Sequence, residues 1–170
     1  MEPALTNLVI SPEAMAGIEA RLGKLVQDAS ATCALLLDHS GQIIGVSGDT
    51  DGRQLVSLGA LLAGNFASAR EIARLLKEPR FKVCLQQGER EHVLTSLVGD
   101  RCLLSVLFAV RGQLGLVKFL SARASDDLAV MVEAGRRQAV ASGLDAKSFR
   151  QAAELSIDSW LREQDGGGLG

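Results

Sequence analysis

ATCALLLDHSGQIIGVSG, residues 31–48, has the pattern of a β-hairpin. The apolar run CALLL predicts one strand, DHSG supplies turn-forming residues, and QIIGV predicts the returning strand. We expect this hairpin to form two neighbouring strands of a sheet, on which the elements before and after it pack. DTDG at 49–52 then predicts a second turn.

Helical patterns flank the hairpin on both sides. Ser11 before Pro12 predicts a helix start, because serine caps a helix and proline fits its first position. Apolar residues at helical spacing extend this helix to about residue 28. Further helices are predicted over roughly 53–77 and 114–138.

Three more strands are predicted between the second and third helices, at 81–86, 91–99 and 102–110. The last is apolar throughout, which indicates a central strand, whereas 81–86 is short and is expected at a sheet edge. The order is α-β-β-α-β-β-β-α with an appended helix. It predicts an α+β fold, in which one five-stranded, mostly antiparallel sheet carries helices on both faces.

The chain is expected to consist of one main domain and a C-terminal extension. We expect the domain at 8–138, a linker at 139–145, an amphipathic helix at 146–163 and a flexible tail at 164–170. Trp160, the only tryptophan, lies in the helical part of the extension. It can serve a protein interface or dock on its own domain, and the sequence leaves both interpretations open. Apolar residues predicted on one side of this helix are Phe149, Ala153, Ile157, Trp160 and Leu161.

Composition excludes several classes of protein. The 170 residues carry a net charge of −2, which argues against a general nucleic-acid binder. The first residues lack a secretory signal pattern, and the longest uncharged run is too short for a membrane span. Cys33, Cys84 and Cys102 are widely spaced in apolar runs, so we expect buried, reduced thiols and a cytoplasmic protein.

The chain shows few residues suited to catalysis. It has no phosphate-binding glycine loop and no cysteine or histidine pair at metal-ligand spacing, so we expect no metal and no cofactor. His39 and His92 are isolated, and we interpret them as structural or solvated residues. Arg70, Arg74 and Arg111 could reach a partner's phosphoryl-transfer site, but ordinary solvated arginines are the favoured interpretation.

The helix over 53–77 has two contrasting sides. A glycine in mid-helix costs about 1 kcal/mol relative to alanine, so the small residues around Gly64 need an explanation. They either let another protein approach closely or lie under a neighbouring element of the same chain. The large residues expected to face the sheet are Leu55, Leu58, Leu62, Phe66, Ile72 and Leu76. The opposite side is predicted to carry Val56, Ala60, Ala63, Gly64, Ala67, Glu71 and Arg74.

Several stretches together resemble the Roadblock superfamily and, within it, the bacterial MglB proteins, over roughly residues 8–163. They are ALLLDHSGQIIGVSG, LVSLGALLAGNFASAREIARLLKEPRF, VGDRCLLSVLF and LGLVKFLSARASDDL. The LxAGN pattern at 61–65, LGLVK at 114–118, and LLKEPRF followed by QQGER carry the likeness. The resemblance implies a Roadblock fold and a homodimer in which the third strands pair, through Val83, Cys84, Leu85 and Gln86.

The resemblance also implies a partner, a Ras-like small GTPase of the MglA type that sets cell polarity. MglB-like dimers accelerate GTP hydrolysis by reshaping the GTPase's own active site without inserting an arginine, and the GTPase itself holds GTP and Mg²⁺. The implied contact residues on the second helix are Ala60, Ala63, Gly64, Ala67, Glu71 and Arg74. Phe149 and Trp160 match a C-terminal helix that touches the GTPase and can promote nucleotide exchange. Such a protein is expected in the cytoplasm, enriched at a cell pole.

Two other functions remain open at this point. A Roadblock scaffold would bind a GTPase without accelerating hydrolysis. A sensing domain would hold a small molecule between sheet and helix, although the bulk of Leu58, Leu62 and Phe66 favours a filled core. Glu71 departs from the small-residue stripe and could alter the choice of partner.

Overall fold

A computed structural model describes residues 10–141 of the chain. The predicted helix at 146–163, the tail at 164–170, and with them Phe149 and Trp160, lie outside the described residues. The described part has the element order α-β-β-α-β-β-β-α that the sequence predicts. Within it, no helix combines the length and the apolar character that crossing a membrane requires.

The five strands form one antiparallel sheet in the order β2-β1-β5-β4-β3. The β5 strand lies in the centre, as its uninterrupted apolar sequence predicts, because it is buried from both faces. The prediction that the short third strand lies at an edge is also confirmed. The strands are β1 (Cys33–Asp38), β2 (Ile43–Gly48), β3 (Val83–Gln87), β4 (Glu91–Val98) and β5 (Cys102–Ala109).

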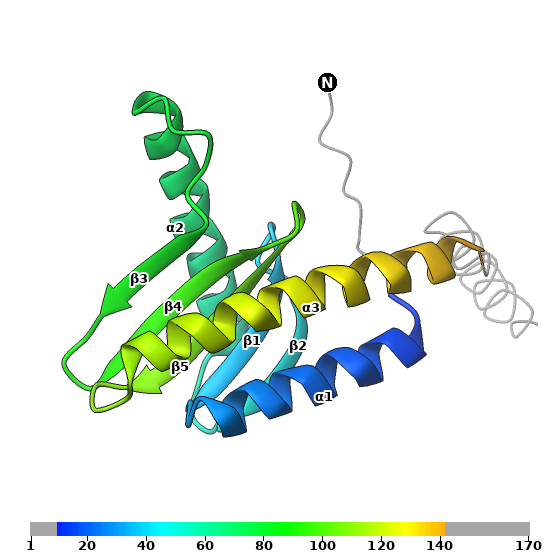
Figure 1. The fold of residues 1–170 in the computed structure, drawn as a ribbon, viewed down its shortest axis with the longest axis horizontal. Coiled ribbons are helices and arrows are strands. Elements are labelled where there is room, and N and C mark those ends of the chain that lie inside the picture. Colours follow the sequence, from blue (N-terminus) through cyan, green and yellow to red (C-terminus); the bar gives the residue numbers. More distant parts are fainter. Residues whose placement is uncertain (1–9, 142–170) are drawn as a thin grey trace, which may run out of the picture.

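Two helices cover one face of the sheet. Figure 1 shows α1 (Pro12–Asp28) and α3 (Leu114–Ala141) crossing this face next to each other. The α1 start is as predicted, because the Ser11 side chain accepts a hydrogen bond from the backbone N–H of Ala14 at 3.3 Å. The α3 helix continues beyond the expected end at 138 to Ala141. Its buried stripe includes Val117, Ala124, Leu128 and Val132, which pack with Ile18, Leu22 and Leu25 of α1.

The opposite face carries a single helix, α2 (Leu55–Leu75). Leu62 and Phe66 are buried on this face with Leu35 and Leu37 of β1. Arg53, just before α2, donates hydrogen bonds to both carboxylate oxygens of Glu91 at 2.9 Å, which ties the helix start to β4. The second half of α2 rises clear of the strands in Figure 1.

This arrangement corrects three predictions for α2. Ile72 and Leu76, expected to face the sheet, are 50% and 63% exposed, because the last turns of the helix have no strand beneath them. Ala63, expected on the outer side, is only 5% exposed and packs in the core beside Leu62. Ala63 lies at the border of the apolar stripe, where a small side chain lets the helix sit close to the sheet.

Candidate partner-binding surface

The outer side of α2 is a low-relief surface. Ala60, Gly64 and Ala67 are all exposed, and a Cβ atom added at Gly64 would meet no atom within 4 Å. None of the described residues therefore covers the middle of this helix. Two interpretations of these small residues were open: cover by a neighbouring element of the same chain, or an exposed side that another protein can approach. Within residues 10–141, Ala60, Gly64 and Ala67 have no such cover and are exposed.

Large apolar side chains border the small residues. Leu61 is 72% exposed, Leu75 is 71% exposed and Val56 is 83% exposed. Exposed apolar residues gathered on one helix are a feature of protein contact sites. We define the α2 surface as nine of the exposed residues of this helix: Val56, Ala60, Leu61, Gly64, Ala67, Glu71, Ile72, Arg74 and Leu75.

Sequence reasoning found only part of the α2 surface. It placed Ala60, Gly64, Ala67, Glu71 and Arg74 on this side, and the structure brings these five residues together. It missed Leu61, Leu75 and the exposure of Ile72, because an apolar residue in an amphipathic pattern is assigned by default to the core. The available signal is their angular position. At 100° per residue Leu61 and Leu75 lie on the small-residue side of the helix.

The charged end of the α2 surface borders a hollow of about 380 Å³. Arg74 donates to Glu71 at 2.9 Å, and both side chains are about two-thirds exposed, so the pair contributes little to stability. Across the hollow, Arg80 pairs with Asp100 at 3.0 Å. Arg70 also lines the hollow and has no hydrogen-bond or ion-pair partner among the described residues, which leaves one cation available there.

The β3 strand presents an open edge. Among the described residues it pairs only with β4, with Cys84 opposite Thr95 and Leu85 opposite Leu94. Val83 is 48% exposed at its start. An uncovered edge of this kind offers unpaired backbone groups to another strand. The predicted dimer residues Val83, Cys84, Leu85 and Gln86 all lie on this strand.

The three cysteines of the described region differ in burial, with Cys33 and Cys102 buried and Cys84 partly exposed. Burial raises the pKa of Cys102 to about 12, and burial also raises the pKa of Cys33 and of the half-buried Cys84. All three are free thiols, and the raised pKa values disfavour the thiolate form, which is the reactive one. The prediction of buried thiols therefore holds for Cys33 and Cys102 and only partly for Cys84.

The two histidines contact other parts of the fold. His39 contacts the backbone oxygen of Asp100 through Nε2 at 2.9 Å, joining two turns at one end of the sheet. His92 is buried edge-on against Phe108, with 5.3 Å between ring centroids. No group of three acidic, cysteine or histidine residues that could hold a metal occurs within residues 10–141. Two features of this region are suited to contact with protein, the α2 surface and the open edge of β3.

Comparison with known proteins places the chain in a family. The Roadblock/LC7 domain model matches residues 18–108. The comparison with curated proteins found no match. Among solved structures, MglB of Myxococcus xanthus is 34% identical with a TM-score of 0.70, and the match covers 74% of this chain and 95% of that one.

Two further solved structures agree with this assignment. The gliding protein MglB from Thermus thermophilus is 31% identical with a TM-score of 0.69, covering 78% of this chain and 98% of that one. A structure described as MglB with tetrameric arrangement is 29% identical with a TM-score of 0.72, and the match covers 79% of this chain and 99% of that one. The family model, the strand order and these identities lead to one conclusion: the chain belongs to the Roadblock/LC7 family and is an MglB-like member of it.

Proposed function

We propose that this protein binds a Ras-like small GTPase of the MglA type through the α2 surface and accelerates its GTP hydrolysis. The observation that carries the proposal is the open, low-relief middle of α2, where Ala60, Gly64 and Ala67 are exposed and space above Gly64 is free. It is the helix that the resemblance to MglB proteins implies as the contact site.

The α2 surface has the physical properties that such a contact needs. Small side chains let a partner's backbone approach the helix closely. Leu61 and Leu75 beside them supply apolar area, and each Å² removed from water contributes roughly 25 cal/mol. The Glu71–Arg74 pair at one end adds charges that can select among partners by complementarity.

Activation by reshaping the GTPase's own site is the mode that we propose, in which this chain supplies no catalytic group. GTP and Mg²⁺ would be held entirely by the GTPase. Phe149 and Trp160, outside the described residues, would add a second contact that promotes nucleotide exchange. The setting that follows is control of cell polarity in the cytoplasm, with enrichment at a cell pole.

The active unit that we propose is a homodimer joined at β3. The open edge of this strand supports the proposal, because two such edges can continue one sheet across two subunits. Val83→Lys places a charge on that edge and is expected to give monomers in light scattering. Val110→Lys, at a similarly exposed valine (41% against 48%), should leave dimers. Equal dimer content in the two variants would contradict pairing through β3.

The function is tested by single-turnover GTP hydrolysis with the MglA-type GTPase of the same organism. We expect hydrolysis to become faster as this protein is added, and binding without acceleration would identify a scaffold instead. Arg70→Ala and Arg74→Ala should each keep the acceleration within a few-fold. A loss of about 10³-fold or more in either variant would indicate an inserted arginine and overturn the proposed mode.

A further inference from the structure

We infer that, in the protein without a bound GTPase, the cavity between the start of α1 and strand β2 is a docking site for this chain's own C-terminal segment, residues 146–163. The cavity measures about 210 Å³ and is lined by Ile10, Met15, Asp38, Gln42, Ile43 and Ile44. Ile10, Met15 and Ile44 pack with the core on the α1 and α3 face of the sheet, and no residue of the α2 surface lines the cavity.

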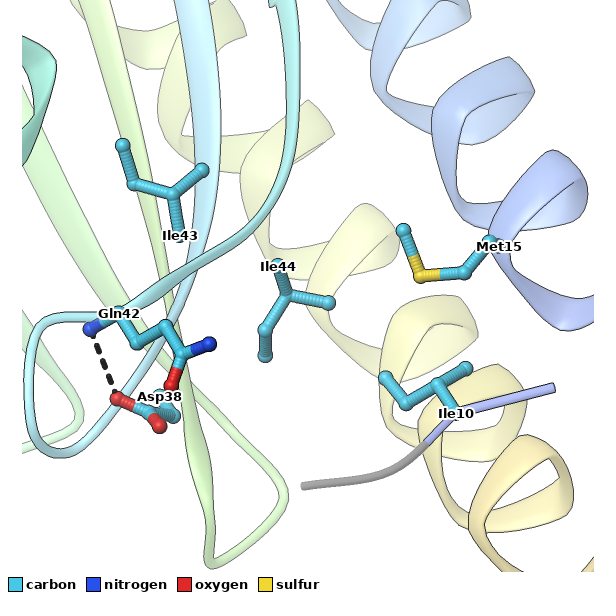
Figure 2. Close-up of a pocket in the computed structure, with 6 residues that line it drawn as sticks. All are labelled: Ile10, Met15, Asp38, Gln42, Ile43 and Ile44. Carbon is cyan, nitrogen blue, oxygen red and sulfur yellow. Dashed lines mark hydrogen bonds between the residues drawn. The ribbon is translucent and has the colours of Figure 1, made fainter. Parts of the chain in front are cut away.

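A local irregularity in β2 lies at the cavity. Leu36 pairs with Gly45 and Leu37 pairs with Ile43, so Ile44 is an extra residue in the strand. Such a bulge redirects a side chain. Figure 2 shows Ile44 directed toward Met15 and Ile10, into the space between strand and helix.

Helix α1 contacts β2 closely at the residue that follows Ile44. A Cβ atom added at Gly45 would lie 3.2 Å from the side chains of Ile18 and Leu22, so helix and strand are in tight contact there. Met15, one turn earlier in α1, is only partly buried and borders the cavity instead. Ile10, Met15 and Ile44 therefore leave apolar surface open to solvent.

Two polar side chains line the cavity, and the carboxylate of one of them, Asp38, is engaged by its own turn. Asp38 Oδ1 accepts hydrogen bonds from the backbone N–H groups of Ser40 at 2.8 Å and Gln42 at 2.9 Å, and from the Ser40 hydroxyl at 2.6 Å. Figure 2 shows the bond to Gln42. At about 210 Å³ the cavity is also smaller than the ~300–1,000 Å³ usual for small-molecule sites. An apolar side chain suits it better than an anionic or drug-sized ligand.

The chain beyond α3 begins beside this cavity. Ser11, next to Ile10, donates from its hydroxyl to Gln138 Oε1 at 2.8 Å. A Cβ atom added at Gly135 would lie 2.8 Å from Ile10, so the last turns of α3 are packed on the cavity wall. The described part of the chain ends at Ala141, only ~4.5 Å further along the helix axis than Gln138.

The length and composition of the chain after Ala141 indicate which segment fills the cavity. Phe149 follows Ala141 by eight residues, a span of at most roughly 29 Å, so it can reach the cavity. The predicted apolar side of 146–163 also carries Ile157 and Trp160. The first nine residues adjoin Ile10 as well, but they contain no aromatic side chain.

Trp160 provides a direct readout, because the chain has one tryptophan and no tyrosine. In the full-length protein alone we expect Trp160 to emit at shorter wavelength than a free tryptophan amide and to resist acrylamide quenching several-fold. Ile44→Asp should shift the emission to longer wavelength and raise quenching to the level of the free amide. Val130→Asp, at a 71% exposed valine of α3, is the matched control and should change neither.

A second variant distinguishes release of the segment from misfolding caused by Ile44→Asp. Phe149→Asp leaves the cavity intact and should release Trp160 equally, with unchanged circular dichroism. Trp160 as accessible as the free amide in the unmodified protein would overturn the inference. Shielding of Trp160 that neither variant changes would also overturn the inference. Shielding that disappears when the protein is diluted would overturn it too, because it would show that the segment docks on a second copy of the chain. No GTPase is present, so the outcome is independent of the proposed function.

Discussion

Helices α2 and α3 lie on opposite faces of one sheet and differ in how much of their length is packed against it. The α3 helix shares its face with α1, and its buried stripe runs from Val117 to Ala139, almost its whole length. The α2 helix is alone, buries Leu62 and Phe66, and leaves its second half largely without strands beneath it. A helix packed along its length stabilises the fold, whereas a helix held at a few positions leaves more of its surface exposed.

The largest predicted effect contrasts a core leucine of α3 with an outer leucine of α2. Leu128→Ala removes a fully buried side chain and should lower the free energy of unfolding by ~2–5 kcal/mol. Leu61→Ala, at a 72% exposed position, should change it by no more than about 0.5 kcal/mol. Urea unfolding at one fixed protein concentration measures both. A similar loss in both variants would mean that the α2 surface is covered.

Substitution of one glycine in each helix should give smaller changes in the free energy of unfolding, and the two changes should have opposite signs. Gly135→Ala in α3 would place its Cβ 2.6 Å from that of Ala14, and the crowding should cost ~1–3 kcal/mol. Gly64→Ala in α2 meets nothing within 4 Å and should instead stabilise by about 1 kcal/mol through helix propensity. Thermal or urea unfolding compares the pair. Destabilisation by Gly64→Ala would show that something lies against this side of α2.

The smallest effect arises only at alkaline pH, in the core under α1 and α3. Burial raises the pKa of Cys102 from 9.0 to about 12 in the folded protein, whereas the unfolded thiol ionises near its ordinary value. The unfolded state therefore loses its proton first, and stability present below pH 9 is lost as the pH rises toward about 12. Cys102→Val should show a weaker fall in unfolding free energy over this range. An identical pH dependence would contradict the burial of the thiol.

The sequence predicts most of the fold because its signals are local. Ser11 and Pro12 mark the start of α1, and the apolar run after Arg101 marks a strand buried on both faces. The α2 surface is harder to predict, because periodicity shows which side of a helix is apolar but not how far the sheet extends beneath it. Periodicity assigns Ile72 and Leu76 inward for this reason, and it assigns Ala63 to the outer side although Ala63 lies at the border of the buried stripe.

The cavity at Ile44 was not predicted from the sequence at all. It depends on one extra residue in β2 and on where α1 leaves the strand, and neither follows from periodicity. A bulge depends on the pairing of two strands, Leu36 with Gly45 and Leu37 with Ile43, which only the assembled sheet defines.

The most direct test of the α2 surface is the affinity of Ala67→Arg for the MglA-type GTPase, measured by titration with the GTPase bound to a non-hydrolysable GTP analogue and to GDP. Ala122→Arg, at an exposed alanine of α3, is the matched control. We predict that Ala67→Arg folds and dimerises normally but loses binding, while Ala122→Arg binds like the unmodified protein. Binding by Ala67→Arg equal to that of the control would contradict the account, and so would a failure of Ala67→Arg to fold.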